Sequence, residues 1–394
     1  MGYNQVEQAR FRLGFKTNAS FSQNWQIKTY LAYGTKDEKF KYGLGVDHIL
    51  SKRKWTTIGA SYKNDYDILG VTDNSGSALQ GTGTSNIFAA LSLASPQARI
   101  NHTIDYRINF TIQPKRDWTF QTTLQNTYFD ALGKRPYFYY KTNPDLATTP
   151  DNLEKNFLYT AATIEARYAY KELMIVRGLE RTRLVRAKAP VVALSYTHGF
   201  KNILGGQFNF DKVQLNLNQH ISTGVFGNAD YNITVGKIFG TLPYPILDVS
   251  KGNQTFLYAE NNYSLMNLYE FVADEYIHVN YVQHFEGLFT NRVPLLKKWK
   301  LRNFAVVKTA YGHLSQENRN LYPEKDKNGM PLTELNTFAN DPYVEVGYGF
   351  ENIFRFFTIG SFHRLTYTQI DNQQYFERKR IRTWGINLGV RFTF

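Results

Sequence analysis

The sequence of 394 residues contains no cysteine and no run of about 18 consecutive apolar residues. A chain without cysteine has neither a disulfide framework nor a zinc or redox site built on thiolates. The absence of a long apolar run excludes transmembrane helices. Proline and glycine, at 12 and 28 residues, are present in ordinary shares, so collagen-like and low-complexity chains are excluded as well.

Aromatic residues and positive charge are what the sequence has in excess. Tyrosine and phenylalanine number 28 and 29, and the formal net charge is +13. A charge of this size predicts an anionic partner, either nucleic acid or a membrane surface that carries phosphate groups. The first residues, Met1 to Asn4, do not form a signal peptide. We therefore expect a mature or truncated product whose upstream periplasmic domain is missing.

Apolar and polar residues alternate along most of the chain. In the clearest stretch, Ile100 to Phe110, mostly apolar residues occupy the even positions and polar residues the odd positions. Side chains along a strand point to opposite faces, so a period of two predicts strands with one apolar and one polar face. Helical spacing occurs only at 86–93.

The alternating segments predict about sixteen strands, an even number as is usual for bacterial barrels. With both chain ends on one side, the long connections 241–273 and 315–341 fall at the outer end. The connections 66–97 and 130–156 then fall at the periplasmic end, where turns should be short. Either these two are unusual insertions or a strand is miscounted, and 173–186 alternates least well. The predicted strands lie near 8–19, 25–34, 39–50, 55–65, 98–112, 117–129, 157–170, 173–186, 190–199, 208–221, 228–240, 274–286, 300–314, 342–352, 354–367 and 380–394.

Two architectures contain many alternating strands. A soluble sandwich buries its apolar face, whereas a transmembrane barrel turns that face toward lipid and its polar face toward the lumen. The predicted strands exceed the roughly 5–6 residues of soluble strands and match the roughly 9–11 that cross a bilayer. We therefore predict an all-β fold, a transmembrane antiparallel β-barrel formed by residues 1–394 as a single domain in the outer membrane of a Gram-negative bacterium.

The last strand carries the most specific pattern. Large apolar residues occupy every second position, and the sequence ends on phenylalanine. This resembles the C-terminal assembly signal of bacterial outer-membrane barrels, in which an alternating last strand ends in phenylalanine. The residues of this signal are Trp384, Ile386, Leu388, Val390, Phe392 and Phe394.

Several short stretches are similar to one known family. They are Tyr3 to Glu7, Phe11 to Gly14, Tyr33 to Gly45, Leu242 to Leu247, Arg292 to Lys298 and Pro342 to Gly347. These stretches resemble a Bacteroidota-type family of unknown function, in which a carboxypeptidase-regulatory-like domain precedes a C-terminal barrel, and the BamA-type barrel superfamily. The resemblance implies a sixteen-stranded barrel with a loop folded into its lumen.

In the BamA-type superfamily this inward loop carries a Val-Arg-Gly-Phe/Tyr motif. The matching stretch here is 241–264, where the nearest equivalent is Ser250 to Asn253, without the arginine. Val176 to Leu179 matches the letters better but lies far upstream. This departure argues against insertase activity and leaves the implied fold intact.

The composition of 241–264 also favours an inward position, because exposed prolines and aromatic rings would leave much apolar surface in water. Charges of both signs on the inward face, such as Lys41 and Asp105, predict salt bridges that brace a plug. Lys251 is expected to contact Glu345 or Glu351. The residues assigned to this lumen loop are Pro243, Tyr244, Pro245, Lys251 and Gly252.

Patterns of catalytic or metal-binding residues are absent. Ser195 and His198 are three residues apart and point to opposite faces of a strand. His278 and His284 share a face of one strand, but no acidic residue or serine is placed to complete a triad. The aspartates within 65–73 lack the spacing of a calcium loop. We therefore predict a non-enzymatic protein with no metal ion and no cofactor.

Basic residues gather in three groups, at 181–188, at 297–302 and before the last strand. They scatter to both ends of the predicted barrel, which argues against nucleic-acid binding. Arginine pairs well with phosphate oxygens, so the last group is assigned to phosphates of lipopolysaccharide, with solvated rim charges as the alternative. Its residues are Arg378, Lys379, Arg380 and Arg382.

Two functions remain open at this point, and a membrane-bound hydrolase is kept as a third class only because some outer-membrane barrels are enzymes. The first is a role in outer-membrane biogenesis or as the membrane component of a larger assembly, and the alternative is a specific or diffusive transport pore. The expected partners are outer-membrane lipid, lipopolysaccharide and other outer-membrane or periplasmic proteins.

Overall fold

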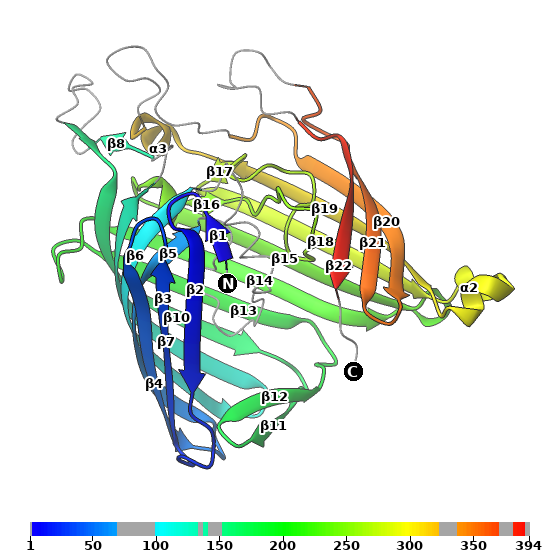
Figure 1. The fold of residues 1–394 in the computed structure, drawn as a ribbon, viewed down its shortest axis with the longest axis horizontal. Helices are drawn as coiled ribbons and strands as arrows, with labels where there is room; N and C mark the ends of the chain where they lie inside the picture. The colour runs from blue at the N-terminus through cyan, green and yellow to red at the C-terminus, as the bar shows by residue number, and fades with distance from the viewer. Residues whose placement is uncertain are drawn as a thin grey trace.

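The computed structural model describes residues 2–68, 99–132, 137–140, 152–322, 337–369 and 381–390. Sixteen strands form one antiparallel sheet, in which neighbours follow one another in chain order. Figure 1 shows this sheet curled into a barrel. Its strands are β1 (Gly2–Asn4), β2 (Gln8–Lys16), β3 (Trp25–Gly34), β4 (Phe40–Ser51), β5 (Thr56–Ile68), β6 (Ile100–Lys115), β7 (Trp118–Ala131), β10 (Asn156–Tyr168), β13 (Val191–Phe200), β14 (Phe210–Ser222), β15 (Asn228–Phe239), β18 (Glu275–Glu286), β19 (Arg302–His313), β20 (Tyr343–Ile353), β21 (Phe357–Arg364) and β22 (Trp384–Val390).

The outward face of the barrel is apolar and its inward face is polar. In β7 the side chain of Leu124 is 50% exposed, whereas Gln121 and Thr127 on the opposite face are buried. In β4 the pattern repeats, with Leu44 exposed and Lys41 buried. This distribution is the reverse of that in a soluble sandwich and confirms the predicted barrel.

The segment 173–186 is not a barrel strand, and this prediction was wrong. It forms β11 (Leu173–Arg177) and β12 (Glu180–Val185), which pair only with each other. Neither strand has a buried residue, which explains why the segment alternates poorly. The hairpin of β11 and β12 belongs to the connection between β10 and β13.

When the segment 173–186 is left out of the strand count, the four long connections no longer fall at opposite ends of the barrel. The strand ends that flank all four predicted long connections lie at the same end of the sheet. At the other end the connections are short, apart from the β11–β12 hairpin and a segment that contains α2 (Pro294–Lys298). We call these the long-loop end and the short-turn end.

The sixteenth strand is β1, which the sequence did not reveal because it is only three residues long. The Asn4 side chain accepts a hydrogen bond from the Glu7 backbone amide at 2.8 Å, and this turn leads the chain into β2. The strand order makes β1 and β22 the two edge strands of the sheet, and no ladder joins them among the described residues.

An apolar core lies inside the barrel at the long-loop end. Inward-facing aromatic residues of the wall pack there against residues of the connections. Phe129 and Phe157 stack with ring centroids 5.2 Å apart, and Tyr137 stacks on Tyr244 at 6.1 Å. The largest members of this core, with at most 3% exposure, are Phe129, Tyr137, Tyr139, Phe157, Phe210, Tyr244, Tyr269, Phe271 and Tyr343.

Helices in the described residues are short. They are α2, α3 (Gln316–Asn320) and the 3-10 turns η3 (Gly224–Phe226), η4 (Tyr244–Ile246) and η5 (Thr290–Arg292). None of the helices in these parts of the chain has the length and apolar composition that crossing a membrane requires. The helical spacing at 86–93 lies outside the described residues.

Candidate functional site

The connection between β15 and β18, residues 240–274, folds into the barrel as predicted, and we call it the lumen loop. Its two short strands, β16 (Asp248–Val249) and β17 (Val272–Ala273), pair with each other. Most of its residues are buried, including Pro243, Tyr244 and Pro245. Figure 1 shows its trace, with β16 and β17, within the ring of strands.

At Gly252 the two halves of the lumen loop lie against each other. A Cβ atom at this position would lie 2.1 Å from the carbonyl oxygen of Asn267. Any other residue would push the two halves of the loop apart. Lys251, beside it, binds the amide of Tyr263 through its own carbonyl oxygen at 2.9 Å.

A buried carboxylate of the wall holds the lumen loop from β20. Glu345, which is 1% exposed, accepts hydrogen bonds from the backbone amides of Ser264 at 2.7 Å and Leu265 at 3.1 Å. The hydroxyl of Tyr343 donates to the same carboxylate at 2.9 Å. The sequence pointed to Glu345 as a partner of the loop, but through Lys251, whereas the structure shows it bound to backbone amides.

A second wall contact is an ion pair with no access to solvent. Arg364 of β21 donates both terminal nitrogens to the carboxylate of Glu270, at 2.6 and 3.1 Å. The two side chains are 0% and 1% exposed. Glu270 also accepts from the backbone amide of Asn267 at 2.7 Å. Fully buried charges require such complete pairing, because each charge has lost its hydration.

His278 of β18 binds the lumen loop as well. Its Nε2 lies 2.8 Å from a carboxylate oxygen of Asp248, and its Nδ1 lies 2.9 Å from the hydroxyl of Tyr263. The prediction that no acidic residue stands beside this histidine was wrong, since Asp248 comes from a distant part of the chain. Burial opposes ionisation of Asp248, but the charges of His278, Lys212 and Lys251 outweigh it and hold the pKa of this carboxyl below its ordinary value.

The lumen loop also pairs with the edge of the last strand. Leu388 of β22 accepts a backbone hydrogen bond from Tyr258 at 2.7 Å and donates one to Phe256 at 2.8 Å. Leu257 thereby forms a parallel bridge with Leu388. The side-chain amide of Asn387 donates to the carbonyl oxygens of Thr255 and Leu257. The edge of β22 is therefore occupied by the loop at this point.

The outward face of β22 is the one that the sequence predicts. Trp384, Ile386 and Leu388 are exposed and Asn387 between them is buried. Phe392 and Phe394, also assigned to the assembly signal, lie outside the described residues, and of Val390 only the strand position is described.

The basic residues assigned to lipopolysaccharide lie partly outside the described residues, which end at 369 and resume at 381. Arg378, Lys379 and Arg380 fall in that gap. Arg382 is described, and its guanidinium donates to the carbonyl oxygens of Asn253 and Ser264 in the lumen loop. We therefore correct its assignment from a phosphate contact to a loop contact.

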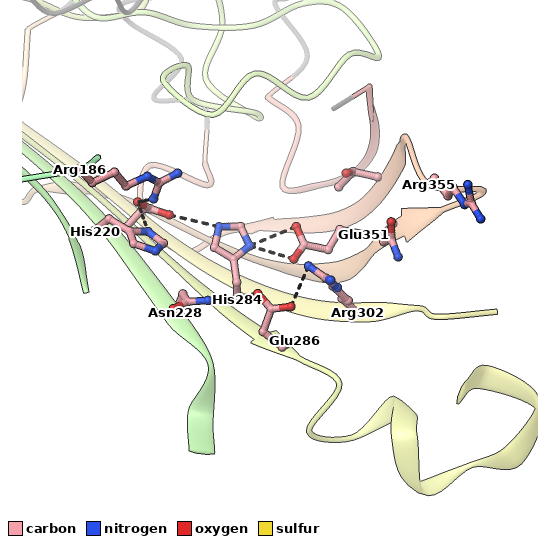
Figure 2. Close-up of a pocket in the computed structure, with 11 residues that line it drawn as sticks. Arg186, His220, Asn228, His284, Glu286, Arg302, Glu351 and Arg355 are labelled. Atoms are coloured by element: carbon pink, nitrogen blue, oxygen red, sulfur yellow. Dashed lines mark hydrogen bonds and ion pairs between the residues drawn. The ribbon is translucent and has the colours of Figure 1, made fainter. Parts of the chain in front are cut away.

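A polar cluster lies below the lumen loop at the short-turn end, around a cavity of about 190 Å³. Figure 2 shows His284 of β18 at its centre, with Glu351 of β20 on one side. The Nδ1 of His284 lies 3.0 and 3.1 Å from the two carboxylate oxygens of Glu351. On the other side, its Nε2 lies 3.6 Å from Asp230 of β15, so one imidazole stands between two carboxylates.

Further charged residues surround this polar cluster. His220 of β14 lies 2.8 Å from Asp230 through its Nδ1. Arg186, from the connection before β13, approaches the same carboxylate to 3.6 Å. Arg302 and Glu286 form a separate pair at 2.8 Å. The sequence did not reveal this cluster, because its members come from strands up to 131 positions apart, as between His220 and Glu351. The available signal was that these residues occupy inward-facing positions near the same end of their strands.

Comparison with known proteins identifies one matching family and shows structures with a similar fold. Residues 1–325 match the family described as "Family of unknown function (DUF5686) C-terminal domain". No curated protein sequence matches the chain. The structure is similar to BamA from Haemophilus ducreyi lacking POTRA domains 1-3, with a TM-score of 0.55 and 8% identity over 98% of this chain and 69% of that one. A second similar structure, CdiB from Acinetobacter baumannii, has a TM-score of 0.46 and 10% identity over 98% of this chain and 57% of that one.

Proposed function

The chain belongs to the DUF5686 C-terminal domain family, and from this premise we propose that it is a non-enzymatic, integral barrel of the bacterial outer membrane. The outward apolar face supports this location, because an exposed surface of that kind is stable only against lipid. We further propose that the barrel acts in outer-membrane biogenesis or as the membrane component of a larger assembly, and not as an open pore.

The observation that carries this proposal is the filled lumen. The lumen loop binds the wall through Glu345, Glu270 and His278, and an aromatic core closes the long-loop end. A diffusive channel needs a continuous polar path lined with water-accessible groups. A loop held by buried charges obstructs such a path, and removing it would cost the free energy of several buried hydrogen bonds.

Conductance of the purified barrel in planar lipid bilayers tests this proposal. The intact chain is expected to give no steady, large open events, and deletion of residues 246–262 is expected to raise the conductance and lower the melting temperature. Glu345→Gln, which keeps the chain length, should shift both quantities in the same directions. The matched control is Glu286→Gln, because Glu286 pairs with Arg302 and does not contact the loop. Steady large openings of the intact chain would favour the transport pore instead.

We also propose that Arg378, Lys379 and Arg380 bind lipopolysaccharide phosphates. Their support is the sequence, together with the position of the strand ends that flank them at the long-loop end. Replacing all three with glutamine should lower the amount of lipopolysaccharide that purifies with the folded barrel. The matched control replaces Lys297, Lys298 and Lys300, which lie at the short-turn end. Equal retention in both triple variants would make the first group ordinary rim charges.

The alternating last strand is proposed to act as the assembly signal. Trp384, Ile386 and Leu388 present the outward apolar face that such a signal requires. Deletion of Phe394 should lower the amount of barrel in the outer membrane of cells while leaving refolding into detergent unchanged. If refolding falls by the same proportion, Phe394 serves the stability of the barrel and not its recognition.

We propose a Bacteroidota origin and a preceding carboxypeptidase-regulatory-like domain in the complete protein. The support is the set of short similar stretches, including Leu242 to Leu247 in the lumen loop and Pro342 to Gly347 at the start of β20. The complete coding sequence tests this proposal directly. A precursor with a different upstream domain would overturn it without affecting the proposed barrel.

A further inference from the structure

The polar cluster and the lumen loop together offer three side chains of the kinds that bind transition-metal ions. Asp230 of β15, Glu260 of the lumen loop and His284 of β18 each offer one ligand atom, and these atoms lie within 4.8 Å of one another. One imidazole and two carboxylates are a donor set that proteins use for zinc and related divalent ions. The ligands come from three different elements, and one of them belongs to the loop and not to the wall.

The orientation of His284 suits metal binding. A carboxylate can only accept hydrogen bonds, so the contact of Nδ1 with Glu351, at 3.0 Å, places the imidazole proton on Nδ1. Nε2 is then the nitrogen that can bind a metal ion, and it faces Asp230. A carboxylate that holds the far nitrogen of a ligating histidine is the usual second layer of a zinc site, where it fixes the tautomer and the ring orientation. His284 is also 7% exposed, so its ring is confined by packing.

The two oxygens of Asp230 have different partners. Oδ1 faces His220 at 2.8 Å and Arg186 at 3.6 Å. Oδ2 faces Nε2 of His284 at 3.6 Å, which is beyond hydrogen-bonding distance. Two ligands that each lie about 2.0–2.1 Å from one zinc ion are about 3.3 Å apart in tetrahedral geometry. The separation of Oδ2 and Nε2 is therefore close to that of two ligands of one ion.

Glu260 completes the set from the lumen loop. Its backbone carbonyl accepts a hydrogen bond from the side chain of Asn280 at 2.8 Å, which fixes this part of the loop against β18. Its side chain is exposed, and Asp230 and Glu260 also line one cavity of about 210 Å³ beside the cluster. Two carboxylates that converge in this way repel each other, and a nearby cation lowers this repulsion, as Arg186 already does at Oδ1 of Asp230.

We propose that Asp230, Glu260 and His284 bind one divalent transition-metal ion, such as Zn²⁺, which ties the lumen loop to the barrel wall. The nitrogen ligand favours zinc, cobalt or nickel over calcium and magnesium, which take oxygen ligands in larger numbers. Glu351 is the positioning residue behind His284. The ion links the loop to the wall at the short-turn end, whereas Glu345 and Arg364 bind the loop from β20 and β21.

Metal titration of the full chain tests this proposal. After treatment with a chelator and its removal, the folded barrel in detergent is titrated with Zn²⁺ by calorimetry and with Co²⁺ by visible absorption. We expect one ion per chain and a rise in melting temperature with Zn²⁺, since a ligand that binds only the folded state stabilises it. Glu260→Gln and His284→Gln should each weaken binding by roughly tenfold or more, and Glu351→Gln by about 10- to 100-fold.

Two controls make the result decisive. Glu286→Gln removes a carboxylate from the same cavity that is already paired with Arg302, so it should leave the affinity unchanged. Glu260 is exposed, so Glu260→Gln should fold even if His284→Gln does not. Absence of saturable binding by the intact chain, or equal affinity in Glu260→Gln, would overturn the proposal and assign any bound ion to an adventitious site.

Discussion

Leu257 of the lumen loop and Leu388 of β22 lie opposite each other as a parallel β-bridge, flanked by two backbone hydrogen bonds of 2.7 and 2.8 Å. The loop thus behaves as a short extra strand on one edge of the barrel sheet. An edge strand exposes backbone groups that can pair with any other strand. Here the protein's own loop binds those groups at Leu388.

A pair of introduced cysteines can measure this bridge, because the chain has none of its own. The double variant Leu257→Cys and Leu388→Cys is expected to form a disulfide on mild oxidation, since paired residues of a bridge bring their Cβ atoms within the range of an S–S bond. The readout is a change in gel mobility that a reductant reverses.

The matched control pairs Leu257→Cys with Ile386→Cys, which lies two residues from the bridge on the same outward face. It should crosslink much less. Equal crosslinking of the two pairs would show that the loop moves freely along β22 and is not bound at Leu388.

The buried pair of Glu270 and Arg364 should be sensitive to the loss of one partner. Arg364→Gln leaves Glu270 as an uncompensated charge with no access to water, so we expect a loss of about 3–5 kcal/mol in the free energy of unfolding. The double variant Glu270→Gln and Arg364→Gln should lose less, because no charge is left unpaired. Denaturant unfolding in detergent gives both values. The single variant Glu270→Gln completes the comparison. A double variant whose loss of stability equals the sum of the losses in Glu270→Gln and Arg364→Gln would show that the pair is not coupled.

Acid should weaken the attachment of the lumen loop at Asp248. The pKa of this carboxyl is lowered in the folded state, so its ionised form contributes stability that is present above its unfolded pKa of about 3.9 and is lost as the pH falls through the lower folded value. We expect the melting temperature to fall below about pH 4 in the intact chain. Asp248→Asn should be less stable at neutral pH and should show a smaller fall on acidification. An unchanged acid profile would exclude this carboxyl as a contributor.

Arginine on the outward face should destabilise the barrel far more than arginine on the inward face. Leu124 and Gln125 are neighbours near the middle of β7 and point to opposite sides. Leu124→Arg should cost about 2–4 kcal/mol when the barrel is refolded into lipid, because it places a charge in the hydrocarbon layer. Gln125→Arg faces the lumen and should cost much less. Equal losses at both positions would contradict the orientation of the sheet.

Much of the fold could be predicted from the sequence, because the period of two is a local signal. Fifteen of the sixteen predicted strands correspond to strands of the barrel. The lumen loop was located by the family resemblance, which its composition supported. The segment 173–186 was misassigned because a free hairpin also contains β-favouring residues, and β1 was missed because three residues cannot display a period. The misassignment of 173–186 also produced the apparent conflict over the ends at which the long connections lie.

The contacts of the lumen loop were less predictable. Glu345 was expected to meet the loop, but its partners are backbone amides, which carry no sequence signal. The polar cluster depends on the pairing of β15, β18, β19 and β20, so that His284 meets Glu351 and Asp230 only in the folded state. Arg382 was expected to bind lipopolysaccharide phosphates and instead donates to the lumen loop, since buried carbonyl oxygens of Asn253 and Ser264 need donors.

The aromatic core at the long-loop end makes the two ends of this barrel mechanically unequal. Rings from β7, β10, β14 and β20 share one close-packed mass with the connections, and close-packed interiors resist compression and dilation alike. The wall from β7 to β20 is therefore held at that end as in the interior of a globular protein. The same strands are held less tightly at the short-turn end, where polar side chains line the wall around a cavity.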